Sequence, residues 1–106
     1  MPDATTAIET LVTLRLTVNN HPGVMSHICG LFARRAYNLE GILVTPINGG
    51  STCSVWLMVN EDSRMDQVIQ QVRKLHDVLD VRVEETGKNV FERLNACLEP
   101  SFATPR

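Results

Sequence analysis

The sequence lacks the features that mark several specialised classes of protein. No apolar run among its 106 residues approaches the ~20 that span a bilayer, so no transmembrane helix is expected. The N-terminal segment has neither a basic region nor an apolar stretch, so no signal peptide is expected, and a cytoplasmic location follows. Basic residues (10) do not outnumber acidic residues (12), which argues against nucleic acid or an anionic membrane as partner.

Cysteines are few and isolated. Cys29, Cys53 and Cys97 are odd in number, lie far apart and include no CxxC pair. The sequence therefore predicts neither a disulfide framework nor a zinc site, and each cysteine is expected to act as a small packing residue. Apolar residues make up 43% of the chain, enough for one small domain with a buried core.

The rest of the chain alternates between patterns typical of strands and of helices. Apolar residues recur with a period of two in half-buried strands and with a period near 3.6 in amphipathic helices. These patterns predict strands over 11–19, 39–48, 52–60 and 77–85, helices from the turn at 19–23 to about Tyr37 and from Asp62 to about Leu75, and a tail helix over 89–99.

Local signals refine the helices. Pro22 suits a first helical position, because it has no N–H to leave unpaired. Ser63 and Asp66 have the spacing of a capping box at the start of the second helix. The tail helix is amphipathic and is expected to lie outside the compact unit.

Other signals refine the strands. Gly41 indicates a bulge or a close approach by another backbone, and Pro46 indicates a strand at a sheet edge. The third strand is apolar on both faces and is predicted to be central. In the fourth strand, Leu79, Val81 and Val83 are expected to face inward.

The order βαββαβ predicts an α+β, ferredoxin-like fold. Two helices would cover one face of a four-stranded antiparallel sheet, and a short C-terminal helix would follow. We expect a flexible N-terminus over 1–9, a compact domain over 10–86 and a tail over 87–106. The helix-free face would carry Thr13, Arg15, Thr17 and either Trp56 or Met58. Such a face, together with an edge strand, favours self-association.

The turn between the first strand and the first helix is the strongest candidate for a ligand site. Backbone N–H groups at a helix start have no partner inside the helix, and with the helix dipole they attract a small anion such as a carboxylate. Gly23 would let a ligand approach the backbone closely. A plain capped helix start has the same pattern, so the turn alone leaves both interpretations open.

No set of residues indicates catalysis. His27 and Cys29 are two apart on a predicted helix and face different directions, which argues against a catalytic Cys–His pair. RNA-binding modules on this fold stack bases on aromatic residues, and the central strands offer only Trp56. Residues 19–25 contain neither the cysteines of a metal chaperone nor the arginine that an acyl-phosphate hydrolase would need.

Longer motifs connect the chain to a known family. The first turn has the form N-x-x-G, the first helix ends in GLFARRAYN, the second strand begins LEGI, and VWLMVNEDSRMDQVIQQVRKLHDV follows. Over residues 11–85 the sequence resembles the regulatory small subunits of acetohydroxyacid synthase (acetolactate synthase), most of all the short isozyme I type. The resemblance implies an ACT domain, the amino-acid-sensing version of the ferredoxin-like fold. Longer small subunits carry a second domain, whereas only the expected tail helix follows here.

The resemblance also implies an effector site for L-valine at the interface of a homodimer. The turn of one chain would meet the start of the second strand of the other. The implied site residues are Asn20, Gly23, Val24, Met25, Asn38 and Leu39. Backbone N–H groups of residues 23–25 would bind the α-carboxylate, and the two asparagine oxygens would accept hydrogen bonds from the α-ammonium group. Leu39, Ile42 and Met25 would contact the isopropyl group.

A regulator rather than an enzyme is therefore expected. The resemblance implies that the chain binds and activates a large catalytic subunit, and that valine lowers the activity through linked equilibria. The catalytic subunit of this family uses thiamine diphosphate, FAD and Mg²⁺, and no cofactor is expected in the present chain. The alternative is a free-standing ACT-domain sensor that regulates another enzyme.

Overall fold

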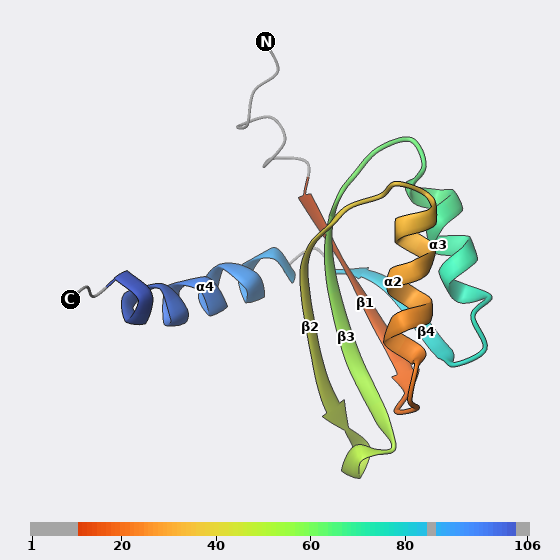
Figure 1. Ribbon diagram of the computed structural model, residues 1–106, viewed down its shortest axis with the longest axis horizontal. Helices are drawn as coiled ribbons and strands as arrows, with labels where there is room; N and C mark the ends of the chain where they lie inside the picture. The colour runs from red at the N-terminus through yellow and green to blue at the C-terminus, as the bar shows by residue number, and fades with distance from the viewer. Residues whose placement is uncertain (1–10, 85–86, 104–106) are drawn as a thin grey trace.

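The computed structural model describes residues 11–84 and 87–103, so the expectation for residues 1–9 lies outside the described part. The elements follow the order β1 (Leu11–Asn19), α2 (Val24–Arg34), β2 (Leu39–Ile47), the 3-10 turn η1 (Asn48–Gly50), β3 (Thr52–Asn60), α3 (Met65–Arg73), β4 (Val78–Glu84) and α4 (Gly87–Ala103). The strands form one sheet in the order β2-β3-β1-β4, and every neighbouring pair is antiparallel. This is the predicted ferredoxin-like fold (Figure 1).

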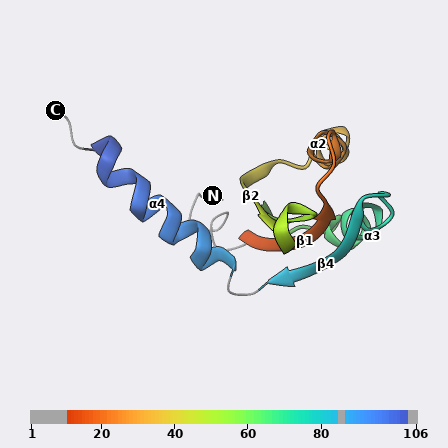
Figure 2. The ribbon, with the colours of Figure 1, turned by 90° about the horizontal axis from the view of Figure 1, so that it is seen from below.

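The sheet separates two unlike layers. Helices α2 and α3 cover one face, and α4 lies on the opposite side (Figure 2). The core forms on the helix-covered face, because β1 and β3 point alternate apolar residues at the two helices. Its fully buried members include Leu14, Leu16, Ile28, Phe32, Val55, Leu57, Val68 and Val72. Full burial of such a side chain contributes about 1.5–3 kcal/mol.

Helix α2 begins two residues later than Pro22 suggested. Gly23 is the N-cap, with φ 90 and ψ −9, and the Val24 N–H donates to the His21 carbonyl at 3.1 Å. These values are those of a type II turn with Pro22 and Gly23 at its two central positions. The prediction that Pro22 occupies the first helical position is wrong, because its fixed φ serves the turn instead.

The far end of α2 also differs from the prediction. The helix ends at Arg34, and Ala36 adopts a left-handed φ of 55. The Tyr37 N–H donates to the Phe32 carbonyl at 2.9 Å and the Ala36 N–H to the Ala33 carbonyl at 3.0 Å. This is a Schellman motif in which alanine occupies the position that glycine usually takes, so no residue before Tyr37 marked the end of the helix.

The start of α3 uses a different residue from the one expected. The N-cap is Arg64, without a side-chain cap bond, and the Asp62 carboxylate accepts the Arg64 N–H at 2.7 Å. The capping box of Ser63 and Asp66 is therefore wrong. An aspartate readily binds the backbone N–H two residues ahead, and that local turn takes the place of the box.

The two edge strands behave differently from each other. Strand β2 carries a register shift between Leu39 and Gly41, which confirms the predicted bulge, and it lies at the sheet edge as expected. In β4 only Val81 is buried, whereas Leu79 and Val83 are 56% and 52% exposed. The expectation that both would be buried is wrong, although Val83 pairs with Leu14 and so does lie on the helix-covered face. The register shifts between β1 and β4 at Thr17/Val18, and Leu79 lies beyond that point.

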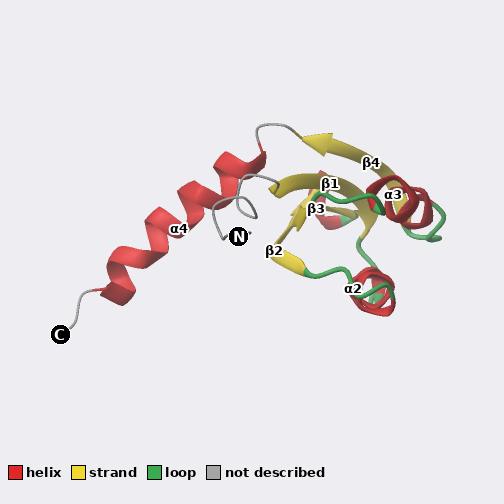
Figure 3. Ribbon diagram, turned by 90° about the horizontal axis from the view of Figure 1, so that it is seen from above, coloured by secondary structure: helices red, strands yellow, loops and turns green. Residues whose placement is uncertain are grey.

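Helix α4 is longer than the predicted 89–99 and is not wholly separate from the domain. Phe91 is buried, and a Cβ at Gly41 would lie 2.9 Å from its ring. The close approach that Gly41 predicted thus involves an aromatic side chain rather than another backbone. The far part of the helix projects away from the sheet (Figure 3).

Candidate functional site

The turn before α2 is anchored on both sides by its own chain. The Asn20 N–H donates to the Ser51 carbonyl at 3.1 Å, and the Asn20 side-chain nitrogen donates to the Gly50 carbonyl at 2.7 Å. An amide that donates through its nitrogen presents its oxygen as an acceptor. The hairpin tip between β2 and β3 therefore orients Asn20 in the way that binding an ammonium group requires.

The opposite side of the turn is held by Asp77. Its carboxylate accepts from the Asn19 side chain at 3.3 Å and lies 3.5 Å from Nδ1 of His21, while the Asn19 N–H donates to the Asp77 carbonyl at 2.8 Å. No pattern in the sequence indicated Asp77, because its role depends on the α3–β4 connection folding back onto the turn.

The backbone donors at the helix start are only partly available. The Val24 N–H, expected to bind a carboxylate, is engaged by the His21 carbonyl that closes the turn. The Val24 side chain is buried in the core. The N–H groups of Met25 and Ser26 belong to the first helical turn and have no acceptor within the helix. Of the expected N–H groups of residues 23–25, that of Val24 is thus engaged within the turn, and that of Ser26 is a further donor at the helix start.

A second set of polar and apolar residues lies at the other end of α2. A hollow of about 290 Å³ lies between this end of the helix and β2, and Asn38, Leu39 and Ile42 contribute to its wall. Its lining residues are Cys29, Phe32, Ala33, Tyr37, Asn38, Leu39 and Ile42. The Asn38 side-chain nitrogen donates to the Glu40 carboxylate at 3.0 Å, so its oxygen is also left as an acceptor. The hollow has the size and the lining for a small aliphatic side chain next to a polar group.

The two groups are too far apart to form one site within a chain. Helix α2 separates them, and its 11 residues span about 16 Å. The structure brings Asn38 and Leu39 together, and it brings Asn20, Gly23, Val24 and Met25 together. A single amino acid cannot touch both groups in one chain, so we call them the turn half-site and the hollow half-site.

An ordered cluster borders the hollow half-site. The Arg64 guanidinium lies 4.7 Å from the centre of the Tyr37 ring and 2.8 Å from the Asp62 carboxylate, and the Tyr37 hydroxyl donates to the Asn60 carbonyl. Burial raises the pKa of the Tyr37 phenol, and hydrogen bonds from Arg64 lower the pKa of the Asp62 carboxyl. Tyr37 thereby forms a fixed wall of the hollow, and no single-residue signal in the sequence indicated this.

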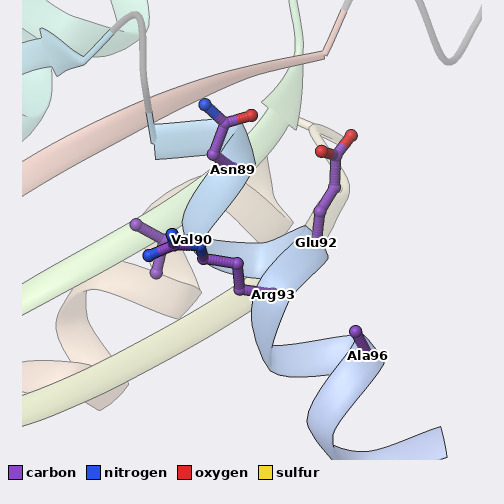
Figure 4. Close-up of a pocket in the computed structure, with 5 residues that line it drawn as sticks. All are labelled: Asn89, Val90, Glu92, Arg93 and Ala96. Carbon is purple, nitrogen blue, oxygen red and sulfur yellow. The ribbon is translucent and has the colours of Figure 1, made fainter.

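The other hollows and surfaces in the described part of the chain offer less. A larger hollow of about 610 Å³ lies along α4, and the described residues that line it, Asn89, Val90, Glu92, Arg93 and Ala96, all belong to that helix (Figure 4). Within residues 11–84 and 87–103, no three His, Cys, Asp or Glu side chains are placed to hold a metal ion. None of the helices in the described ranges is long and apolar enough to cross a membrane.

The topology is that of ACT domains, a class of ferredoxin-like modules. A solved ACT domain from the GTP pyrophosphokinase of Chlorobium tepidum shares this fold, with a TM-score of 0.54 at 20% identity over 70% of this chain and 96% of that one. The model for acetohydroxyacid synthase (AHAS) small-subunit-like ACT domains matches residues 14–80. The chain belongs to this family.

Individual relatives agree with this assignment. The isozyme 1 small subunit of acetolactate synthase from Escherichia coli is 51% identical over 83 residues, which cover 78% of this chain and 86% of the relative. A probable acetolactate synthase small subunit from Archaeoglobus fulgidus is 32% identical over 88% of this chain and 57% of its own length. The crystal structure of the Thermotoga maritima small subunit matches with a TM-score of 0.62 and 31% identity, over 69% of this chain and 46% of that one. The chain thus spans about half the length of the longer relatives.

Proposed function

We propose that the chain is the regulatory subunit of an acetohydroxyacid synthase, that it activates the catalytic subunit, and that L-valine reverses this effect. The proposal rests on the family membership and on the two half-sites. The chain itself would carry no cofactor and would work in the cytoplasm, while the catalytic subunit would hold thiamine diphosphate, FAD and Mg²⁺.

The position of the half-sites relative to β2 is the observation that carries the proposal. The hollow half-site lies at the start of β2, next to Leu39. The turn half-site is tied to the end of β2, because Asn20 is bonded to Gly50 just beyond Ile47. If two copies pair antiparallel through their β2 edges, the start of one strand lies opposite the end of the other. That pairing brings the hollow half-site of each chain toward the turn half-site of its partner.

Exposed residues on β2 support this mode of pairing. Ile42 and Val44 are 46% and 40% exposed, although both are large apolar residues on a strand with a free edge. An unpaired edge with apolar side chains is a template for adding another strand. A two-fold axis across β2 would then create two equivalent sites per dimer.

The complete site would recognise each part of the amino acid. The N–H groups of Met25 and Ser26 would bind the carboxylate, helped by the positive end of the α2 dipole. The Asn20 oxygen of one chain and the Asn38 oxygen of the other would accept from the ammonium group. The apolar hollow would hold the isopropyl group, and one methylene more or less would change the affinity by only ~1–3 kcal/mol. Leucine and isoleucine are therefore expected to compete weakly.

The test is reconstitution with the acetohydroxyacid synthase catalytic subunit of the same organism. Acetolactate formation should rise when the chain is added and fall again as L-valine is titrated, but not when D-valine is titrated. A chain that binds L-valine without affecting the catalytic subunit would instead be a free-standing sensor. A chain that neither binds L-valine nor changes the activity would contradict the proposal.

A further inference from the structure

Helix α4 crosses the open side of the sheet and continues past its edge. It starts close to the end of β4, runs toward β2 and projects beyond β2 on the side away from α2 and α3 (Figures 2 and 3). Its 17 residues span about 26 Å, longer than the four-stranded sheet is wide at ~4.8 Å per strand. The far half of the helix therefore extends beyond its own domain.

One face of α4 packs on the sheet near the start of the helix and becomes more exposed farther along the helix. Phe91 is 6% exposed and packs against Gly41 and Met58 on the open face. Leu94, one turn later, is half-buried, and Leu98, one turn beyond that, is 47% exposed. The three residues lie on one stripe, because residues three to four apart share a helix face. Among the residues that the structure describes, the stripe is thus buried at Phe91, half-buried at Leu94, beside Leu43 of β2, and largely exposed at Leu98.

An apolar groove marks the place where α4 leaves the sheet. It has a volume of about 300 Å³ and is lined by Leu43, Val90, Arg93, Leu94 and Cys97. Leu43 pairs with Trp56 across β2 and β3, and Trp56 pairs with Arg15 across β3 and β1. Leu43, Trp56 and Arg15 thus form one row across the open face. The neighbouring row consists of Gly41, Met58 and Thr13, and Phe91 rests on it. The exposed part of the open face and the exposed part of the stripe therefore meet at the β2 edge.

A short helix without a packed face is only marginally stable in water. The far half of α4 consequently needs an apolar surface to pack against. That surface has to begin at the sheet edge formed by β2. An edge-to-edge partner sheet meets this requirement, because it would extend the same open face in the direction in which α4 points.

We propose that α4 is an exchanged arm: in a dimer paired through β2, the α4 of each chain crosses the shared edge and packs Leu94 and Leu98 on the open face of the second copy. The surface that receives the arm is the row formed by Leu43 and Trp56. This inference rests on the β2-paired dimer of the proposed function, but it adds a second contact to it. Both arms cross the same two-fold axis, so each chain gives one helix and receives one.

The single tryptophan gives a direct test, since Trp56 lies on the receiving surface. The labelled chain would carry Trp56→Phe, Cys29→Ser and Cys53→Ala, with bimane on the exposed Cys97. Tryptophan quenches bimane on contact, and this chain has no tryptophan of its own. Excess unlabelled wild-type chain should then remove most of the bimane emission as mixed dimers form. Unlabelled Trp56→Phe chain is the matched control and should leave the emission unchanged.

A second variant separates the arm from the β2 contact. Leu98→Lys on the labelled chain should abolish the quenching and raise the dimer dissociation constant about tenfold, as measured by sedimentation. Mixed dimers that form without quenching would overturn the arm and leave the proposed function intact. Emission that changes only when the catalytic subunit is added would assign α4 to that subunit and would also overturn the arm. A chain that stays monomeric at every concentration would overturn both the arm and the β2-paired dimer.

Discussion

The two edges of the sheet expose similar amounts of apolar surface but carry different charges. On β4, Leu79 and Val83 are exposed, and on β2, Ile42 and Val44 are exposed. The two strands differ in the charged residues that accompany these exposed side chains. Strand β4 holds an Asp80–Arg82 ion pair at 2.9 Å, whereas the only charged residue of β2 is Glu40 at its start.

The chain also occupies polar groups on β4 with its own side chains. Arg73 of α3 donates to the Val81 carbonyl at 3.1 Å, and Glu84 lies 3.8 Å from Arg15 on the neighbouring strand. Charges and engaged carbonyls discourage the addition of another strand. Strand β2 carries only Pro46 and the bulge near Gly41 as features that discourage pairing, and both half-sites lie at its ends. The comparison supports the proposed dimer, in which β2 rather than β4 would be the pairing edge.

The largest expected effect is on the dimer dissociation constant, and it distinguishes the β2 edge from the β4 edge. Val44→Asp would place a charge in the β2 interface, where desolvation is costly, so the dimer dissociation constant should rise about 100-fold. Leu79→Asp on β4 is the matched control, because it exchanges a comparably exposed residue on the other edge. Sedimentation velocity over a concentration series measures both. Equal weakening by the two changes would contradict the distinction between the edges.

The seating of α4 at the β2 edge gives the next effect. Gly41→Ala brings a Cβ within 2.9 Å of the Phe91 ring, so α4 must shift. We expect the free energy of unfolding to fall by about 1–3 kcal/mol, measured by urea titration. Gly30→Ala is the control, since its Cβ would meet only the Arg34 side chain at 3.4 Å, and alanine favours a helix over glycine by roughly 0.5–1 kcal/mol. A Gly41→Ala variant with the wild-type free energy of unfolding would show that Phe91 does not seat α4 on the sheet.

The asparagines at the two ends of β2 should each matter for effector binding. Asn20→Ala or Asn38→Ala removes an acceptor for a charged ammonium group, so each should weaken L-valine binding by ~1–3 kcal/mol in calorimetric titration. Gln67→Ala on the exposed face of α3 is the control and should bind as the wild type does. Unchanged affinity in both asparagine variants would exclude the assigned site.

A smaller effect concerns the end of α2 that borders the hollow half-site. Ala36 has a φ of 55, which costs an L-residue roughly 1–2 kcal/mol, whereas glycine adopts it freely. Ala36→Gly should therefore raise the unfolding free energy by about 0.5–1 kcal/mol, after the entropy that glycine loses. Ala33→Gly within the same helix should lower it by a similar amount. Destabilisation by both changes would mean that Ala36 is not strained.

The acid stability of the Asp62–Arg64 pair follows from the direction of one pKa. Hydrogen bonds from Arg64 lower the pKa of Asp62 in the folded chain, so the pair stabilises the fold above the unfolded pKa near 3.8 and is lost as pH falls through the lower folded value. The group is fully exposed, so the effect is expected to be small. Asp62→Asn should flatten this part of the pH profile of thermal unfolding. A profile identical to that of the wild type would show that the Asp62–Arg64 pair does not contribute to acid stability.

Patterns that repeat along the chain predicted the fold well. The period-two alternation predicted β1 over 11–19, the range that the structure shows, and identified its core face. A run that is apolar on both faces predicted β3 over 52–60, also the observed range, and its central place in the sheet. The errors fall at points where two local solutions compete. Pro22 suits a helix start and a type II turn equally, Asp62 competes with Ser63 for the backbone at α3, and Ala36 ends a helix without glycine.

The family resemblance supplied the candidate site residues and their expected arrangement across two chains, but not the contacts that hold each half-site in place. The motifs pointed to Asn20 and Asn38, whereas the placements of Asp77 and Tyr37 depend on contacts between segments that are distant in the sequence. Glu40 lies only two residues from Asn38, but it also accepts from Asn60 of β3. Similarly, the alternation in β4 placed Leu79 and Val83 on the inner face without showing that no element covers them. Periodicity reports which face a residue lies on, and the neighbouring elements decide whether that face is buried.

The central claim is that one effector site is built from two chains across the β2 edge. The most direct measurement mixes the Asn20→Ala and Asn38→Ala chains and titrates the mixture with L-valine. A mixed dimer would hold one site with both asparagines intact and one with neither, so wild-type affinity should reappear in about a quarter of the sites if the chains associate at random. A mixture that binds no better than either variant alone, although mixed dimers are present, would contradict the claim.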